Sequence, residues 1–253
     1  MVRVIACTNQ KGGVGKTTTV INLAAFLALS GTRTLVIDLD PQGNATSGLG
    51  IDRRIVDHST YDALVERVPI PDLVMNTSVE GLDLVPSSPS LSGAEVELVG
   101  VPARERRLSA SLAALDDRYE RVLIDCPPSL GLLTVNALTA ADGVLIPIQT
   151  EYYALEGLSQ LVTTIRRVRE DLNPRLEIDG VLLTMYDART KLSAQVASEV
   201  RRHMNGSVYQ TVVPRSVRLS EAPSHGLPIA LYDPASRGAD AYRELAGEVV
   251  ARG

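Results

Sequence analysis

The feature that most restricts the fold of this chain is a glycine-rich loop between a strand-like run and a helical pattern. The loop, Asn9 to Thr18 (NQKGGVGKTT), follows the apolar run Val2 to Cys7. Apolar residues with a helical period come next, at Ile21, Leu23, Ala24, Leu27 and Ala28. Glycines let backbone N–H groups converge on phosphate oxygens, and a helix N-terminus adds partial positive charge. The order strand, loop, helix therefore predicts a polyphosphate site, and it disfavours the alternative of a turn that binds nothing.

Lysine usage in this loop supports a phosphate ligand. The whole chain has only three lysines among its 25 basic residues, and two of them are Lys11 and Lys16. A flexible ammonium enters a phosphate site as a point charge, whereas a guanidinium imposes planar geometry. We expect Lys16 to reach the β- and γ-phosphates and the Thr17 hydroxyl to ligate Mg²⁺. The predicted ligands are ATP and Mg²⁺, and the predicted ATP contacts within the loop are Lys11, Gly12, Gly13, Val14, Gly15, Lys16, Thr17 and Thr18.

Acidic residues follow two further apolar runs. Leu35 to Ile37 leads into Asp38 and Asp40, and Val122 to Ile124 leads into Asp125. We expect Asp125 to hold Mg²⁺ through water, because a metal that bridges phosphates needs hard oxygen ligands; a strand-end cap is the alternative. Asp40 is predicted to orient or deprotonate the attacking water, and Asp38 to support it.

Short apolar runs alternate with helical patterns along most of the chain. The predicted strands are Val2 to Cys7, Thr34 to Ile37, Leu82 to Val85, Arg121 to Ile124, Gly143 to Ile148, Val181 to Met185 and Val208 to Val213. Strands that are apolar at nearly every position are buried on both faces. The pattern predicts an α/β fold with a mostly parallel twisted sheet covered by helices on both faces. Residues 52–101 are the least regular part, and exposed loops and short helices are expected there.

Composition favours one compact domain over residues 1–253 in the cytoplasm. The chain is 45% hydrophobic, and neither a signal peptide nor an apolar stretch of roughly 18 residues is present. Cys7 and Cys126 have no metal-type spacing, so buried free thiols are expected. The net charge of −5 argues against nucleic-acid binding over the whole surface. Residues 161–218, however, carry ten basic and six acidic side chains, so this segment is +4 and the remainder is −9.

In several stretches the chain resembles the ParA/Soj branch of the deviant Walker A ATPases, P-loop NTPases with a second lysine in the loop. The matching stretches are Lys11 to Thr18, Asp38 to Gly50, Asp125 to Gly131, Glu151 to Gly157, Leu182 to Met185, Pro214 to Gly226 and Tyr232 to Gly238. One departure is Ser216, where the family commonly has asparagine. By this resemblance Pro214 and Ser216 should lie against the adenine.

The resemblance also implies how such a protein works. The family forms an ATP-sandwich homodimer, in which Lys11 of one subunit reaches the nucleotide of the other. Lys11, Lys16 and Asp40 are thus the expected catalytic residues. The ATP-bound dimer binds double-stranded DNA without sequence preference, which places it on the nucleoid, and a ParB/Spo0J-type partner stimulates slow hydrolysis. Arg189 and Arg218 match basic residues of the family's DNA-binding face; surface salt bridges are the alternative for both.

Three other classes of protein are alternatives to the ParA/Soj family. A MinD-like regulator should end in a basic amphipathic membrane helix, but the tail from Tyr242 to Gly253 is mixed in charge and nearly without aromatics. An iron–sulfur scaffold should carry bridging cysteines, and a purely structural protein should not turn over ATP. Arg166, Arg167 and Arg169 are expected on a solvated helix face rather than on DNA.

Overall fold

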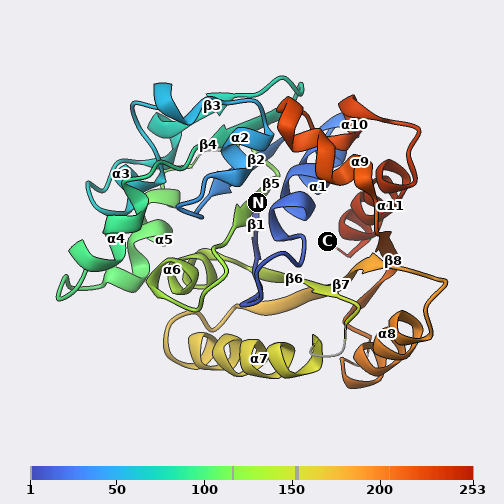
Figure 1. Cartoon of the computed structure of the whole chain (residues 1–253). Helices are drawn as coiled ribbons and strands as arrows, with labels where there is room; N and C mark the ends of the chain where they lie inside the picture. Colours follow the sequence, from blue (N-terminus) through green and yellow to red (C-terminus); the bar gives the residue numbers. More distant parts are fainter. Residues whose placement is uncertain (1, 116, 152–153, 205, 253) are drawn as a thin grey trace.

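The computed structural model describes residues 2–115, 117–151, 154–204 and 206–252 (Figure 1). Within these residues one sheet contains β1 (Arg3–Cys7), β2 (Thr34–Asp38), β3 (Met75–Asn76), β4 (Leu82–Val85), β5 (Arg121–Asp125), β6 (Gly143–Gln149), β7 (Glu177–Tyr186) and β8 (Val208–Pro214). Their order is β3-β4-β2-β5-β1-β6-β7-β8. The short edge strand β3 pairs antiparallel with β4, and the other pairs of neighbours are parallel.

Helices cover both faces of the sheet. The α-helices are α1 (Lys16–Leu29), α2 (Asn44–Gly48), α3 (Thr60–Leu64), α4 (Leu91–Glu97), α5 (Arg107–Leu112), α6 (Leu132–Ala140), α7 (Ala154–Asp171), α8 (Lys191–His203), α9 (Val217–Glu221), α10 (Ile229–Tyr232) and α11 (Arg237–Ala251). Four 3₁₀ turns join them within the described residues: η1 (Arg53–Ile55), η2 (Ile70–Leu73), η3 (Arg104–Arg106) and η4 (Ala222–His225). Figure 1 shows α6 and α7 on one side of the sheet and α1 and α11 on the other.

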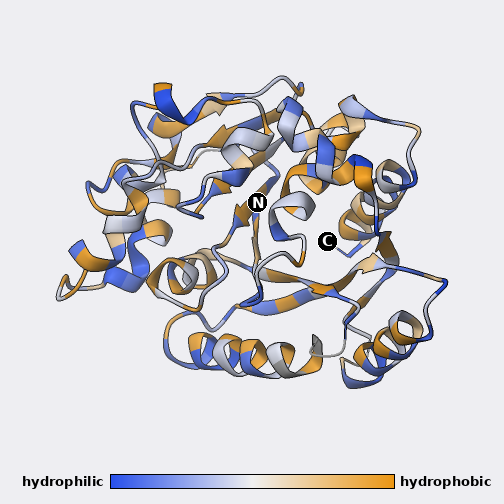
Figure 2. Ribbon diagram, viewed as in Figure 1, coloured by the Kyte–Doolittle hydropathy of each residue, from blue (hydrophilic) through white to orange (hydrophobic). Residues whose placement is uncertain are grey.

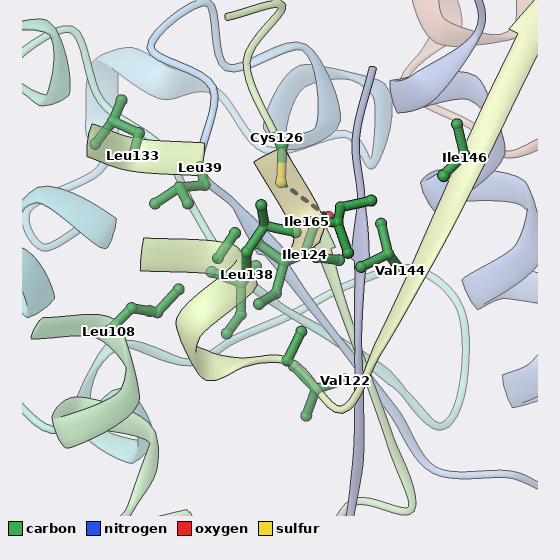
Figure 3. Packing of buried hydrophobic residues seen from close by; sticks show 14 of the residues in the cluster. Leu39, Leu108, Val122, Ile124, Cys126, Leu133, Leu138, Val144, Ile146 and Ile165 are labelled. Carbon is green, nitrogen blue, oxygen red and sulfur yellow. Dashed lines mark hydrogen bonds between the residues drawn. The ribbon is translucent and has the colours of Figure 1, made fainter. Parts of the chain in front are cut away.

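Alternating side chains of the strands supply two separate cores. In β5, Val122 and Ile124 face the core shared with α5, α6 and α7, and Leu123 faces the core shared with α1 and α11. Figure 3 shows part of the first core, in which Ile124 lies near Leu138 of α6 and Ile165 of α7. Figure 2 shows hydrophilic and hydrophobic residues alternating along α7 and α8. Such amphipathic helices pack their apolar sides onto a sheet that is buried on both faces.

The same alternation points two carboxylates toward the N-terminus of α1. Asp38 and Asp125 each follow a residue that faces the α6 side, and the register aligns them as neighbours across β2 and β5. Asp125 is in turn aligned with Cys7 at the end of β1, just before the glycine-rich loop. Because parallel strands end at one edge of the sheet, the loop and both carboxylates meet there.

The predicted fold class is confirmed, and all seven predicted strands are present with bounds shifted by zero to four residues. Strand β3 was not predicted, because its two residues are too few to show a period. The short helices predicted for residues 52–101 are present as α3, α4, η1 and η2, but the expectation that the region is exposed was partly wrong. Leu64, Ile70, Leu91 and Leu98 from this region are buried in the α6-side core. Irregular spacing hid their burial, because short helices and 3₁₀ turns show no full helical repeat.

The C-terminal helix α11 is an integral part of the fold. Its buried side chains include Tyr242, Leu245 and Val249, and they belong to the core shared with α1. The hydroxyl groups of Tyr242 and Thr19 of α1 lie 3.2 Å apart, within hydrogen-bond distance. None of the helices in the described ranges has the length and apolar character needed to cross a bilayer.

Candidate functional site

The glycine-rich loop is shaped to present backbone N–H groups. Gly13 and Gly15 have φ angles of 75° and 88°, a left-handed conformation that side-chain-bearing residues rarely adopt. Gly15 precedes α1, and no described side chain caps that helix N-terminus. The first turn of α1 also contains no acidic residue. The uncapped N–H groups and the positive end of the helix dipole therefore form an anion site.

Hydrogen bonds to β6 and β7 hold the loop in place. Asn9 donates to the Pro147 carbonyl at 2.7 Å and accepts from the Lys11 N–H at 3.0 Å. On the other side, the Thr184 hydroxyl donates to the Val14 carbonyl at 2.8 Å. Both anchoring side chains are buried. These contacts order the loop before any ligand arrives, which lowers the entropic cost of binding.

The two loop lysines have different surroundings. Lys16 is buried, and its ammonium donates to the Lys11 carbonyl at 3.3 Å, so it lies inside the curl of the loop. The Lys11 side chain is 44% exposed, and its ammonium lies 2.9 Å from a carboxylate oxygen of Glu151. Gln149 also donates to the Glu151 carboxylate. The structure thus separates an internal lysine from one that points out of the site.

Thr17 and Asp125 form the part of the site that suits a divalent cation. The Thr17 hydroxyl donates to one carboxylate oxygen of Asp125 at 2.7 Å. The other oxygen of Asp125 is buried and has no hydrogen-bond partner among the described residues. An unpartnered buried carboxylate oxygen is costly, and a hydroxyl and a carboxylate are the hard ligands that Mg²⁺ prefers. The residues present therefore fit a magnesium ion held with a polyphosphate.

Asp38 ends β2, and Asp40 lies in the loop that follows it. One oxygen of Asp38 accepts from both the backbone N–H and the hydroxyl of Thr46, at 2.8 and 2.6 Å. Its other oxygen accepts from the Asp40 N–H at 3.2 Å. The Asp40 carboxylate accepts only from the Gln42 N–H, at 2.9 Å, among the described residues. Both carboxylate oxygens of Asp38 thus accept hydrogen bonds that hold the loop after β2. One carboxylate oxygen of Asp40 has no donor among the described residues and can bind another group.

Burial makes Asp38 and Asp125 weaker acids than usual. Burial is the largest effect on Asp38 and, opposed by the Thr46 hydrogen bonds, raises its pKa to about 6. Burial and the neighbouring charge of Asp38 together hold the pKa of Asp125 well above its usual value. The Thr17 hydrogen bond and the Lys16 charge act in the opposite direction on Asp125. Burial thus makes it costly for these carboxyls to ionise in the empty site, and a bound cation would offset that cost.

A cavity of about 120 Å³ lies beside the loop on the side of β8. Its lining comprises Gly15, Thr18, Thr184, Met185, Val213, Pro214, Arg215, Ser216, Leu219, Ser220 and Tyr242. Pro214 and Ser216, the residues expected near the adenine, thus share one cavity with Gly15 and Thr18 of the loop. Met185 has a φ angle of 49°, an uncommon left-handed conformation for a residue with a side chain.

The two arginines predicted to contact DNA both carry acidic partners. Arg189 makes two side-chain hydrogen bonds to Asp187, at 2.9 and 2.8 Å, yet its side chain is 87% exposed. Arg218 lies 3.0 Å from Glu221 and 3.4 Å from Asp233. The surface salt bridges weighed as the alternative are therefore present in the single chain. Exposed pairs of this kind are worth little, so they leave both guanidinium groups free to exchange partners.

Other sequence predictions have clear outcomes. Cys7 and Cys126 are buried free thiols, as expected. Arg166, Arg167 and Arg169 are exposed on α7, which agrees with the solvated face. Tyr152 and Tyr153 of the Glu151 to Gly157 stretch lie outside the described residues.

Several residues that shape the site were not singled out from the sequence. Thr184 is a polar residue inside the apolar run of β7, and that interruption was a usable signal. Glu151 and Thr46 stand within family-like stretches but had no assigned role. Asn9 opens the loop, and its contact with Pro147 spans 138 residues of sequence. Long-range contacts of this kind leave no local pattern.

Comparisons with known proteins agree with this geometry. A family model described as an AAA domain matches residues 2–178. The sporulation initiation inhibitor protein Soj of Bacillus subtilis is 59% identical, with 100% of each chain covered. The chromosome partitioning protein ParA of Caulobacter vibrioides is 54% identical, covering 99% of this chain and 95% of the relative. A solved structure of cobyrinic acid a,c-diamide synthase from Mycobacterium smegmatis, with bound ATP analog and magnesium, is 40% identical with a TM-score of 0.87, covering 99% and 95%.

The raised pKa of Asp125 predicts a pH-dependent effect of Asp125→Asn on stability. In the ligand-free wild type, the native carboxyl holds its proton at a pH where the unfolded one, near the usual value of 3.8, has lost it. The free energy of unfolding therefore falls as pH rises from about 4 through the raised native pKa, by up to about 1.4 kcal/mol per pH unit. Asn cannot titrate, so the stability of the variant relative to wild type should rise over this range.

Urea unfolding between pH 4.5 and 7.5, without nucleotide and with EDTA, measures this difference. Asp52→Asn is the matched control, because hydrogen bonds from Arg54 lower the pKa of Asp52 to about 2. Its stability relative to wild type should change little over that range and should not rise. A constant difference between Asp125→Asn and wild type would contradict the prediction.

Proposed function

Because the chain belongs to the Soj and ParA family of chromosome-partitioning ATPases, we propose that it is an ATP-driven switch in chromosome or plasmid segregation. In this proposal the ATP-bound protein is a homodimer that binds double-stranded DNA without sequence preference. A ParB/Spo0J-type protein bound at centromere-like sites stimulates slow hydrolysis, and the dimer then leaves the DNA. The observation that carries the proposal is the outward, half-exposed position of Lys11 beside a loop that already contains a buried lysine.

The proposed nucleotide is ATP with Mg²⁺. The uncapped N-terminus of α1 and the Lys16 ammonium would bind the phosphates, and the cavity beside Pro214 and Ser216 would receive the base. Thr17 and Asp125 would hold Mg²⁺, which supplies charge neutralisation for the transferring phosphoryl group. Binding of the cation would also satisfy the unpartnered oxygen of Asp125.

Asp40 is the proposed residue for the attacking water. Its carboxylate has one described hydrogen-bond donor, and its own carbonyl is held by the Ser87 hydroxyl at 2.7 Å. A fixed backbone with an available carboxylate oxygen suits a group that orients water and accepts its proton. Asp38, by contrast, is occupied by Thr46 and the Asp40 N–H and would act by positioning that loop.

The proposed dimer interface lies on the outer side of the loop. Lys11 can leave Glu151 for the nucleotide of the other subunit, because their half-exposed ion pair contributes little stability. A Cβ built on Gly12 would contact nothing within 4 Å in its own chain. Packing within the subunit therefore gives no reason for glycine at this position. A close approach by a second subunit would explain it.

Gly12→Val tests the dimer. The variant should stay folded and bind ATP within about a factor of three of wild type, a difference below ~1 kcal/mol. It should remain monomeric with ATP and Mg²⁺ in size-exclusion chromatography with light scattering, under conditions where the wild type dimerises. Gly247→Val is the control, since a Cβ there is equally unobstructed but lies on α11. An ATP-dependent Gly12→Val dimer would count against the proposed interface.

Asp40→Ala tests the assignment of the catalytic carboxylate. Turnover of ATP should fall by roughly 10² to 10⁴-fold, the usual contribution of general base catalysis. ATP should still bind, so the variant should accumulate as an ATP-bound dimer. Lys16→Ala is the contrasting variant, because it should lose nucleotide binding itself. Wild-type turnover by Asp40→Ala would remove the assignment.

Arg189→Ala tests DNA binding with an internal control. Asp52 and Arg54 repeat the geometry of Asp187 and Arg189, and the Arg54 side chain is similarly exposed, at 89%. With ATP, Arg189→Ala should weaken binding to any duplex and reduce the slope of log K against log salt by about 0.9 for each phosphate that the variant no longer neutralises. Fluorescence anisotropy at several salt concentrations measures both. Equal losses in Arg54→Ala would argue against a specific DNA-binding face.

A further inference from the structure

A second cavity lies away from the glycine-rich loop and contains three arginines. It has a volume of about 230 Å³ and opens between the turn after α3 and the start of α5. Its lining comprises Arg67, Pro69, Pro102, Ala103, Arg106, Arg107, Ala110, Ser111 and Ala114. Helix α5 is anchored by Leu108, labelled in Figure 3, in the core on the α6 side of the sheet. The loop and α1 pack on the other core, so this cavity is separate from the proposed ATP site.

Arg107 is the unusual residue of this cavity. Only 9% of its surface is exposed, and its Nε and Nη1 atoms are buried without a hydrogen-bond partner among the described residues. A buried guanidinium normally has carboxylate or carbonyl partners, because leaving its N–H groups unmet costs free energy. Burial, and secondly the charge of Arg67, lower the pKa of Arg107. The group is thus held in surroundings that disfavour its charge.

The ion pairs found among the described residues include none with Arg67, Arg106 or Arg107. The Glu105 carboxylate, whose pKa is lowered first by hydrogen bonds and also by the charges of Arg104 and Arg106, lies outside the cavity lining. The lining of the cavity likewise contains no aspartate or glutamate. Three arginines that line one concave space without an acidic residue in the same lining form a site for an anion with several oxygens. Phosphate is the best match, since planar guanidinium groups bind its oxygens in pairs.

The other lining residues of the cavity indicate which kind of molecule the phosphate would be attached to. Pro69, Pro102, Ala110 and Ala114 supply apolar contact area next to the arginines. Liquid water occupies about 30 Å³ per molecule, so the cavity has room for roughly seven water-sized units, more than one phosphate group needs. We propose that this cavity binds a small phosphorylated organic ligand, with its phosphate on Arg67, Arg106 and Arg107 and its carbon portion on the prolines and alanines.

Isothermal titration calorimetry tests this site with the ATP site saturated by ADP and Mg²⁺. The probes are inorganic phosphate and glycerol 3-phosphate, with ionic strength held constant by NaCl. The wild type should bind glycerol 3-phosphate saturably at one site per chain, and more tightly than inorganic phosphate. Arg107→Met and Arg67→Gly should each weaken binding by about 10-fold or more, the loss expected for a charged hydrogen bond. Arg201→Ala, an exposed arginine on α8 outside the cavity, should bind as the wild type does.

Two features keep the test independent of folding. Arg67 has a φ angle of 62°, which glycine adopts without strain, so Arg67→Gly should fold normally. Without ligand, Arg107→Met should melt at or above the wild-type temperature, because it removes an unpartnered buried charge. Absence of saturable binding in the wild type, or unchanged affinity in both variants, would overturn the proposal. So would binding of duplex DNA that depends on Arg67 while neither phosphate probe binds, because the cavity would then be a nucleic-acid contact.

Discussion

The site depends above all on the register of three adjacent parallel strands. The register of β2, β5 and β1 aligns Asp38, Asp125 and Cys7 across one edge of the sheet, next to the loop that begins α1. A one-residue slip of a strand would turn its side chains to the opposite face. Asp125 would then point into the apolar core instead of toward Thr17. The two cores on either side hold this register, so the packing of leucines and valines on both faces fixes where the carboxylates lie.

The cost of this arrangement is a pair of buried carboxyls in surroundings that disfavour their charged forms. One oxygen of Asp125 has no hydrogen-bond partner among the described residues, and burial is the main cause of the raised pKa values of Asp38 and Asp125. In the proposed function, a cation bound with the nucleotide would offset this cost by stabilising the ionised carboxylates.

The positive groups of the molecule follow a second pattern. Lys11, Arg189 and Arg218 each have an acidic partner within their own chain. In the proposed function, such partners would leave the unliganded surface only weakly attractive to DNA. A partner with more negative charge, such as a phosphate, can replace them at small cost. Arg107 differs from all three because it is buried and its Nε and Nη1 atoms have no hydrogen-bond partner in the described part of the chain, and this contrast sets the second cavity apart from the proposed DNA surface.

The sequence by itself determined the fold class, the strands and the loop, because double-sided burial and the glycine-rich pattern are local signals. Gly13, Gly15, Lys16 and Thr17 could be placed from their spacing alone. The proximity of Pro214 to Gly15 came from family resemblance, and the tertiary structure brings both into one cavity. Only the tertiary structure decided that Thr184 and Asn9 hold the loop, that Asp38 is occupied by Thr46, and that Arg107 lies buried without a partner. The contacts of Asn9 and Thr184 join residues 138 and 170 positions apart. The energy of all these contacts is set by burial and geometry, which the sequence does not record locally.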